Sequence, residues 1–313
     1  MFAAFLTTIL FSISVVCGHR TAKLIGGVEA NFWRLATATL FLGFWAYGFG
    51  KGVDGVAFPV FFLSGLIGIG VGDAGLFQAL PRLGSRLSLL ILQCFTAPIA
   101  AFTEWVWLGT PLGPLQMFCM LIILSGVAAA LLPGEHLTIG RRQLVTGVAF
   151  AALGAAGNGL GAVLSRKAYA IAHANAENLD GGTAAFQRIL GGLLLSALLL
   201  LVVKRQFVRL PDSAGDAMDT TSARGKWKRI WPWVAMNSLA GQTFGVSAMQ
   251  LALETTPTGI VLSIVALTPL VVIPFARVFE HEKITARSLL GGGVAVVGVV
   301  GLTWTKFKMA APH

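Results

Sequence analysis

The stretch GLIGIGVGDAGLFQAL, residues 65–80, has a counterpart in SLAGQTFGVSAMQLAL, residues 238–253. Both stretches are apolar and both end in Ala-Leu. Each also carries two glycines four residues apart: Gly68 and Gly72 in the first, Gly241 and Gly245 in the second. This glycine spacing favours close packing of membrane helices. The match predicts that the two halves of the chain are duplicates of one another.

Further matches lie on either side of this pair. FWRLATATLFLGF (32–44) aligns with FQRILGGLLLSAL (186–198), which places Arg34 and Arg188 at the same position near the start of a helix. Later in each half, a proline falls inside the following apolar run: Pro98 and Pro269. Several matches in the same order indicate a duplicated unit of several helices.

Composition places the whole chain in a membrane. Of its 313 residues, 56% are apolar and only 12% are charged, about half the charge of a soluble protein. A helix needs about 20 apolar residues to span a bilayer. The apolar runs that we expect to span it are 2–18, 31–49, 57–80, 87–108, 114–133, 143–165, 183–203, 230–253, 258–279 and 288–305. The sequence thus predicts an all-α integral membrane protein with ten transmembrane helices.

Five helices in each unit have a geometric consequence. An odd number makes the second unit enter the membrane from the opposite side, so the first repeat (2–133) and the second (143–305) would form an inverted pair. Inverted repeats are typical of secondary transporters whose site lies near the bilayer midplane. Within the second repeat, the polar stretch 204–229 predicts a mobile loop.

Ionisable residues inside the apolar runs are few, and such groups usually mark a transport pathway. They are Arg34, Asp73, Glu104, Arg188 and Arg277. Asp73 has two possible roles. It binds a coupling proton or a substrate amine, or it is a buried residue that stabilises helix packing through a hydrogen bond or an ion pair. Arg34 and Arg188 either line a vestibule for an anionic or zwitterionic solute or extend to the lipid headgroups. Extension to the headgroups is also the simpler expectation for Glu104 and Arg277.

Uncharged residues complete the candidate pathway. Gln93, Gln242 and Asn158 are amides inside apolar runs, where they either contact a solute or hydrogen-bond to a neighbouring helix. Pro98 and Pro269 each remove a backbone donor, so each is a candidate hinge or a static bend. The glycine pairs of residues 65–80 and 238–253 are expected to serve helix packing.

The chain resembles the ten-helix, EamA-type members of the drug/metabolite transporter superfamily over nearly its whole length. The resemblance is carried by the two arginines and by GDAGLFQALPRLG (72–84), WLGTPLGPLQ (107–116), ALETTPTGIVLSIVALTP (252–269) and FEHEKITARSLLGGGVAVVG (279–298). It implies a small-solute carrier, most often an exporter, in a bacterial inner (plasma) membrane. The acid that the family carries after its fourth helix is replaced by Leu108-Gly109-Thr110, whereas Glu282 keeps it in the second half.

Other function classes are weighed against a carrier. Gly70-Val71-Gly72-Asp73 matches the GxGD string of intramembrane aspartyl proteases, but that chemistry needs a second nearby carboxylate. A passive channel is the other alternative. We expect no catalytic, metal or cofactor site and no nucleic-acid partner. The expected partners are a solute, the bilayer and a coupling proton, and the sequence leaves a homodimer open.

The orientation in the membrane is also left open. With a cytoplasmic N-terminus, only five basic residues outside the apolar runs would face the cytoplasm: Lys51, Arg166, Lys167, Lys306 and Lys308. Because basic residues normally accumulate on the cytoplasmic side, the count favours the opposite orientation. The family resemblance favours cytoplasmic termini.

Overall fold

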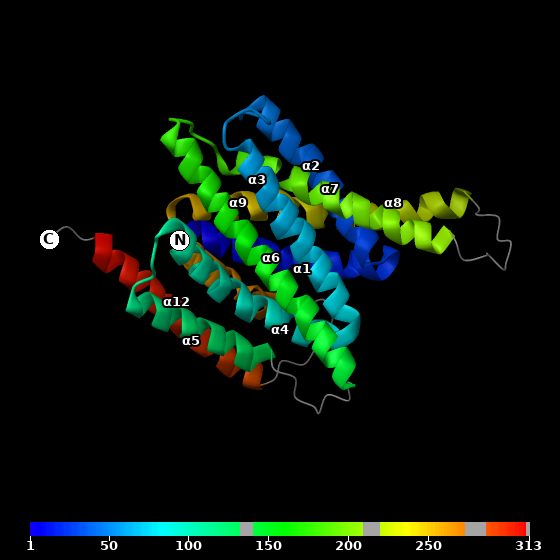
Figure 1. Ribbon diagram of the computed structural model, residues 1–313. Coiled ribbons are helices and arrows are strands. Elements are labelled where there is room, and N and C mark those ends of the chain that lie inside the picture. The colour runs from blue at the N-terminus through cyan, green and yellow to red at the C-terminus, as the bar shows by residue number, and fades with distance from the viewer. Residues whose placement is uncertain (132–139, 209–219, 273–285, 311–313) are drawn as a thin grey trace.

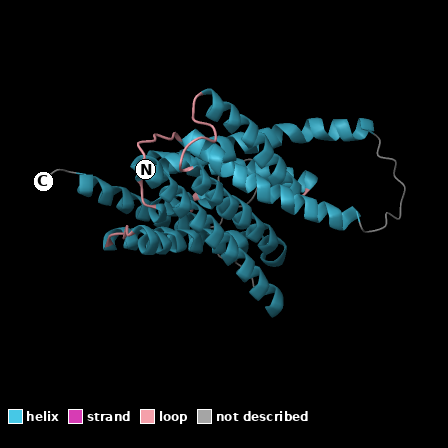
Figure 2. Ribbon diagram, turned by 45° about the horizontal axis from the view of Figure 1, so that its top comes forward, coloured by secondary structure: helices cyan, strands magenta, loops and turns pink. Residues whose placement is uncertain are grey.

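The computed structural model describes residues 1–131, 140–208, 220–272 and 286–310. Over these residues the regular structure is helical and no strand is present (Figure 2). The helices (Figure 1) are α1 (Phe2–Ile25), α2 (Gly27–Gly48), α3 (Phe58–Gly65), η1 (Leu66–Val71), α4 (Gly72–Leu108), α5 (Pro114–Leu131), α6 (Arg141–Ala174), α7 (Gly181–Val208), α8 (Thr220–Asn237), η2 (Ser238–Gly245), α9 (Val246–Thr255), α10 (Thr258–Val265) and α12 (Ala286–Ala310).

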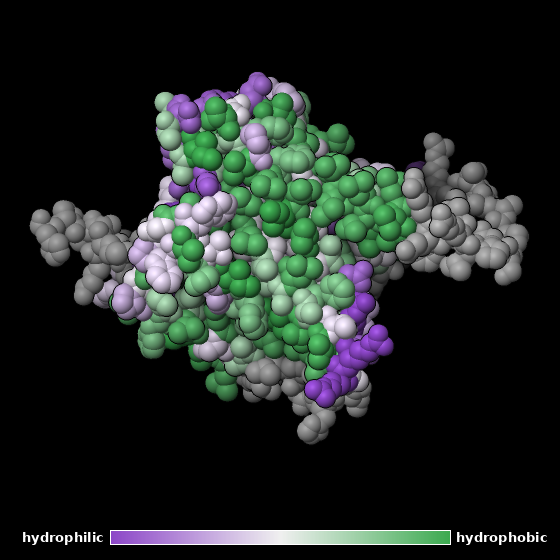
Figure 3. All heavy atoms as spheres, in the orientation of Figure 1, coloured by the Kyte–Doolittle hydropathy of each residue, from purple (hydrophilic) through white to green (hydrophobic). Residues whose placement is uncertain are grey.

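Length and composition allow six of the described helical segments to cross a membrane. These are Phe2–Ala22, Phe58–Leu83, Leu87–Leu108, Pro114–Leu131, Arg141–Ala174 and Gly181–Val203. Two shorter apolar helices, Thr258–Val272 and Leu290–Leu302, accompany them. In Figure 3, apolar side chains cover most of the visible face, and hydrophilic ones gather at the lower-right end of α6 and along the upper edge. This is the surface of a protein surrounded by lipid.

The third helix of each half contains a π-helical segment. η1 interrupts the helix that begins as α3 and continues as α4, and η2 joins α8 to α9. The glycine pairs at 68/72 and 241/245 lie in these two segments or at their ends. π-helical turns occur frequently at functional sites. Nothing in the hydrophobic pattern had predicted them.

The break predicted between residues 80 and 87 is not a loop, because α4 continues through it as helix. The chain nevertheless reverses direction there. A Cβ on Gly75 would meet the backbone of Gly154, and Leu92 also reaches Gly154, so both arms of the helix lie against the same turn of α6 (Figure 1). Pro81 lies at the bend. Its missing N–H and its clash with the preceding turn bend the helix without ending it.

The two stretches that match in the sequence make similar contacts. Glycines of η1 and α4 face α6, and glycines of η2 face α1: Gly68 with Gly161, Gly72 with Asn158, Gly241 with Ser14 and Gly245 with Phe11. In addition, Thr8 and Ser12 of α1 donate to the carbonyls of Ile264 and Thr268, at 3.1 Å in both cases. α1 therefore contacts η2 and α10, as α6 contacts η1 and the later arm of α4.

The last helices of the two halves, α5 and α12, pack against each other in opposite directions. Gly126 approaches Gly291 and Ala295, whereas Cys119, earlier in α5, approaches Gly301, later in α12. Glycines on both helices allow this close approach.

Part of the predicted mobile loop 204–229 is helical. α7 extends to Val208 and α8 begins at Thr220, so both helices enter the stretch, and 209–219 lie outside the described residues. Polar composition alone did not reveal that the helices continue past their apolar segments.

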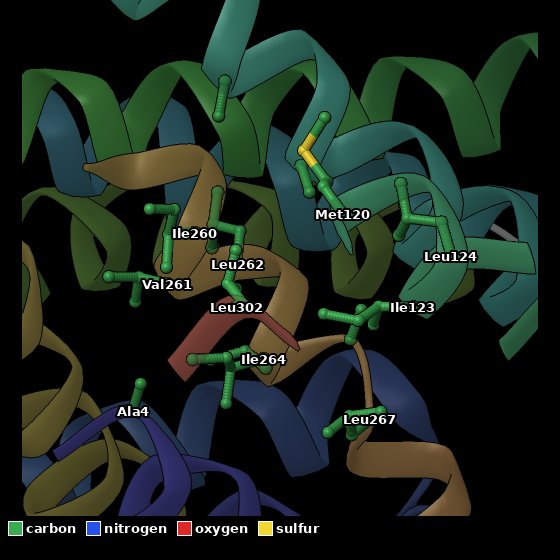
Figure 4. Close-up of a cluster of buried hydrophobic side chains, with 14 of the residues drawn as sticks. Ala4, Met120, Ile123, Leu124, Ile260, Val261, Leu262, Ile264, Leu267 and Leu302 are labelled. Carbon is green, nitrogen blue, oxygen red and sulfur yellow. The ribbon is translucent and has the colours of Figure 1, made fainter. Parts of the chain in front are cut away.

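The largest apolar core surrounds α10. Ile260, Val261 and Ile264 pack with side chains from α5, α12 and α1 (Figure 4). Ile264 is fully buried, as are Ile123 of α5 and Leu302 of α12. The short helix α10 is thus held by helices from both halves of the chain.

The N-terminus of α7 is capped by Asp180, which lies outside the membrane-spanning segments. Its Oδ1 accepts hydrogen bonds from the backbone N–H groups of Gly182 (2.9 Å) and Thr183 (3.0 Å) and from the indole N–H of Trp45 (2.9 Å). Partial burial acts to raise the pKa of Asp180, but the hydrogen bonds from Thr183, Trp45 and Gly182 outweigh it and hold the pKa below 3.8. The charged cap fixes the start of α7 against α2.

Candidate functional site

Arg34 and Asp73 form an ion pair between α2 and α4. The Arg34 Nη2 lies 3.0 Å from Asp73 Oδ2, and each side chain is 21% exposed. The same nitrogen donates to Asn31 Oδ1 at 2.6 Å. Asn31 was not among the predicted site residues, although its place one helical turn before Arg34 would have indicated the contact.

Arg188 is more deeply buried than Arg34. It is 3% exposed, so the expectation that it extends to the lipid headgroups is wrong. Its Nε and Nη1 have no hydrogen-bond partner among the described residues, and the charge that acts on it is that of Asp73. A buried charge without a close partner is costly. Arg34, Asp73 and Arg188 therefore form one cluster with two positive charges and one negative charge.

Glycines of η1, of the start of α4 and of α6 lie beside this cluster. A Cβ on Gly68 would lie 2.6 Å from the Arg188 Nη2 and 3.1 Å from the Cα of Gly161. One turn further on, a Cβ on Gly72 would meet the amide of Asn158 at 2.9 Å. Only glycine leaves room here for the guanidinium and the amide between two backbones. The structure thus places the Asn158 amide beside Gly72, the residue that precedes Asp73.

A cavity of about 230 Å³ borders the cluster on the side of Asp73. Its polar lining comes from Asn31, Asp73, Gln78 and Ser196. The rest of its wall is apolar or glycine and comes from α2, η1, α4, α6 and α7, with Phe77 and Phe150 as its aromatic residues. A mainly apolar cavity with a few polar groups at one side is the usual form of a small-molecule site.

A second buried network lies close to Arg188 and was not predicted. The hydroxyls of Ser64 and Ser165 are 2.7 Å apart, and Gln250 Nε2 donates to Ser165 Oγ at 3.1 Å. All three residues are fully buried, and Gln250 Oε1 has no partner among the described residues. Serines at these positions carry no distinctive sequence signal because hydroxyls are common in membrane helices. The network joins α3, α6 and α9 beside the charged cluster.

Glu104 does not extend to the headgroups as expected. Its side chain is 2% exposed, and its Oε1 lies 2.7 Å from Arg166 Nε. The hydroxyl of Thr110 donates to Oε1 at 2.9 Å, and the backbone N–H of Thr258 donates to Oε2 at 2.6 Å. A single carboxylate therefore joins the end of α4 to α6 and to the start of α10. The sequence could not show that Arg166, which the apolar pattern placed in a loop, lies on the longer helix α6.

We expect Glu104→Gln to lower stability by about 3 kcal/mol, because it leaves Arg166 without its buried counter-ion. The thermal unfolding midpoint of the purified protein in detergent should fall by several degrees. Glu254→Gln makes the same chemical change in the partly exposed pair with His173 and should cost less than about 1 kcal/mol. Equal midpoints for the two variants would contradict a stabilising role for Glu104.

No described hydrogen bond or ion pair joins the remaining candidates to the cluster. Gln93 is half-buried in α4, and no described contact joins it to Asp73. Gln242 is buried in η2 with its Oε1 unpartnered among the described residues. Pro98 lies within the continuous helix α4, whereas α10 ends at Val265, shortly before Pro269. Arg277 and Glu282 lie outside the described residues.

Comparison with known proteins identifies the fold and the family. The chain matches 29 chains of solved structures; one of them, a crystal structure 13% identical to it, covers 98% of both chains with a TM-score of 0.74, which shows a shared fold. A search of curated proteins finds no match. The model of the EamA-like transporter family matches residues 1–132 and 145–304. The chain is therefore a multi-pass membrane protein and belongs to the EamA-like transporter family of the drug/metabolite transporter superfamily.

Proposed function

We propose that the protein is a secondary transporter that exports a small solute across the cytoplasmic membrane. The observation that carries this proposal is the largely buried cluster of Arg34, Asp73 and Arg188 beside the glycines of η1. Ionisable groups are energetically unfavourable inside a membrane, and where they occur they usually belong to a solute or ion pathway. The neighbouring cavity of about 230 Å³ has room for a small molecule.

Alternating access between two inverted five-helix repeats is the proposed mechanism. Two features support it: the antiparallel packing of α5 against α12, and the equivalent contacts that α1 and α6 make with η2 and η1. Two halves that pack in this way around one site can exchange conformations, so that the site faces each side in turn. In this scheme Pro98 and Pro269 are the hinges and Asp73 carries the coupling proton.

A protease is less well supported than a carrier. Asp73 of the GVGD string is paired with Arg34, and Glu104 is engaged with Arg166. An aspartyl dyad requires two carboxylates that share a proton at short range. The charged groups that act on Asp73 in the described part of the chain are two arginines, which is the wrong charge for such a dyad.

Reconstituted flux tests the proposal. Solutes that accumulate in the medium when the host overproduces the protein would be loaded into proteoliposomes. We expect saturable uptake that is accelerated by unlabelled solute on the opposite side, because counterflow requires an alternating site. Flux that rises linearly with concentration and shows no counterflow would instead indicate a channel.

A further inference from the structure

The two arginines occupy equivalent positions but have unequal surroundings. With Gly72 aligned to Gly245, Asp73 aligns with Val246. Arg34 therefore finds a carboxylate at 3.0 Å in its own repeat, and the second repeat offers Arg188 an apolar side chain that is 4% exposed. Both repeats therefore carry the cation, but only the first carries an anion at the aligned position.

Arg188 is nevertheless a buried cation with guanidinium nitrogens that no described residue engages. It is 3% exposed, its Nη2 lies against Gly68, and its Nε and Nη1 are unpartnered among the described residues. Arg34 also has an unpartnered Nε. Nitrogens of a guanidinium form a planar fork that matches the two oxygens of a carboxylate. With two positive charges and one negative charge, the cluster is neutralised by one monoanion.

We propose that the transported solute carries a carboxylate and that this carboxylate binds Arg188, supplying the negative charge that Val246 does not. The inference rests on the proposed transport function and specifies its substrate class. Asp73 stays with Arg34, and the uncharged part of the solute extends toward the cavity beside Asp73, whose wall is mainly apolar. A carboxylate accordingly binds better than an amine of the same shape.

Thermal stabilisation of the purified protein in a neutral maltoside detergent tests this without a known substrate. The probes are three matched pairs at constant ionic strength: acetate with ethylamine, benzoate with benzylamine, and indole-3-acetate with tryptamine. Because a ligand that binds the folded state raises the unfolding midpoint, we expect at least one carboxylate to raise it in a saturable way and its amine to have no effect. Stabilisation by the amines instead, by inorganic phosphate alone, or by none of the carboxylates would overturn the proposal.

Variants of Arg188 test whether the carboxylate binds at this residue. Arg188→Gln should weaken the binding of the effective carboxylate by roughly tenfold or more, the usual scale for loss of a charge-assisted pair. Arg188→Lys keeps the positive charge but lacks the planar guanidinium, so its affinity for the carboxylate should lie between those of the wild type and Arg188→Gln. The matched control is Arg142→Gln, an exposed arginine of α6, which should bind as the wild type does. Equal binding by the wild type and both Arg188 variants would refute the assignment.

Flux measurements separate this inference from the transport function. Saturable counterflow of a solute that lacks a carboxylate would support the transport function and contradict the proposed carboxylate site. Carboxylate binding that depends on Arg188, without flux of any bound carboxylate, would support the binding site and contradict the proposed transport function.

Discussion

Replacement of Asp73 by asparagine is expected to reduce transport by about 100-fold or more while the protein still reaches the membrane in normal amount. The substitution keeps the size of the side chain but removes the negative charge between Arg34 and Arg188. The two guanidinium groups then repel one another without compensation in a poorly solvated site. Counterflow in proteoliposomes, normalised to the amount of reconstituted protein, measures the effect.

Asp54→Asn provides the control for this experiment. Asp54 is exposed in the turn after α2, so its substitution changes the net charge by the same amount away from the cluster and should leave transport near the wild-type rate. Normal transport by the Asp73 variant would remove Asp73 from the coupling mechanism and make the Arg34 ion pair a packing element.

Replacement of Gly65 by alanine should have the largest effect on folding. A Cβ at this position would overlap the backbone carbonyl oxygen of Arg188, and backbone atoms cannot rotate away as a side chain can. α3 and α7 must therefore separate, which loses the close contact that Gly191 makes with Phe62 on the same surface. We expect a loss of about 3 kcal/mol or more, together with a displaced Arg188.

The control for Gly65→Ala is Gly293→Ala. Gly293 is an exposed glycine in α12, and a Cβ there would meet nothing within 4 Å. Alanine favours helix over glycine by up to about 1 kcal/mol, so this variant should be as stable as the wild type or slightly more stable. Thermal unfolding midpoints and gel-filtration profiles of the purified variants provide the comparison. A Gly65 variant as stable as the Gly293 variant would mean that α3 and α7 do not touch through their backbones.

Much of the charged cluster could be predicted from the sequence. The repeated context of Arg34 and Arg188, and the position of Asp73 among glycines, singled out these three residues because ionisable groups in apolar runs are rare. Their arrangement could not be predicted. Whether Asp73 pairs with one arginine or the other depends on how α2, α4 and α7 approach each other, and the spacing within one helix says nothing about that distance.

The contrast between Glu104 and Gln93 makes the same point. Both lie on the apolar helix α4, yet Glu104 is tied to Arg166 and Thr258, and no described contact joins Gln93 to the site. Both of these partners of Glu104 lie more than 60 residues away along the chain. Hydropathy assigned Arg166 to a loop because a charged residue ended the apolar run, although the helix continues to Ala174.

Long apolar runs, scarce charge and internal repetition determined by themselves that the chain is helical, lies in a membrane and carries two arginines in matching sequence contexts. These properties follow from local composition and from the free-energy cost of polar groups in lipid. Only the tertiary structure decided that one arginine has a carboxylate and the other is buried without one. That difference arises where backbones of separate helices meet at glycines, and such contacts depend on packing across the fold.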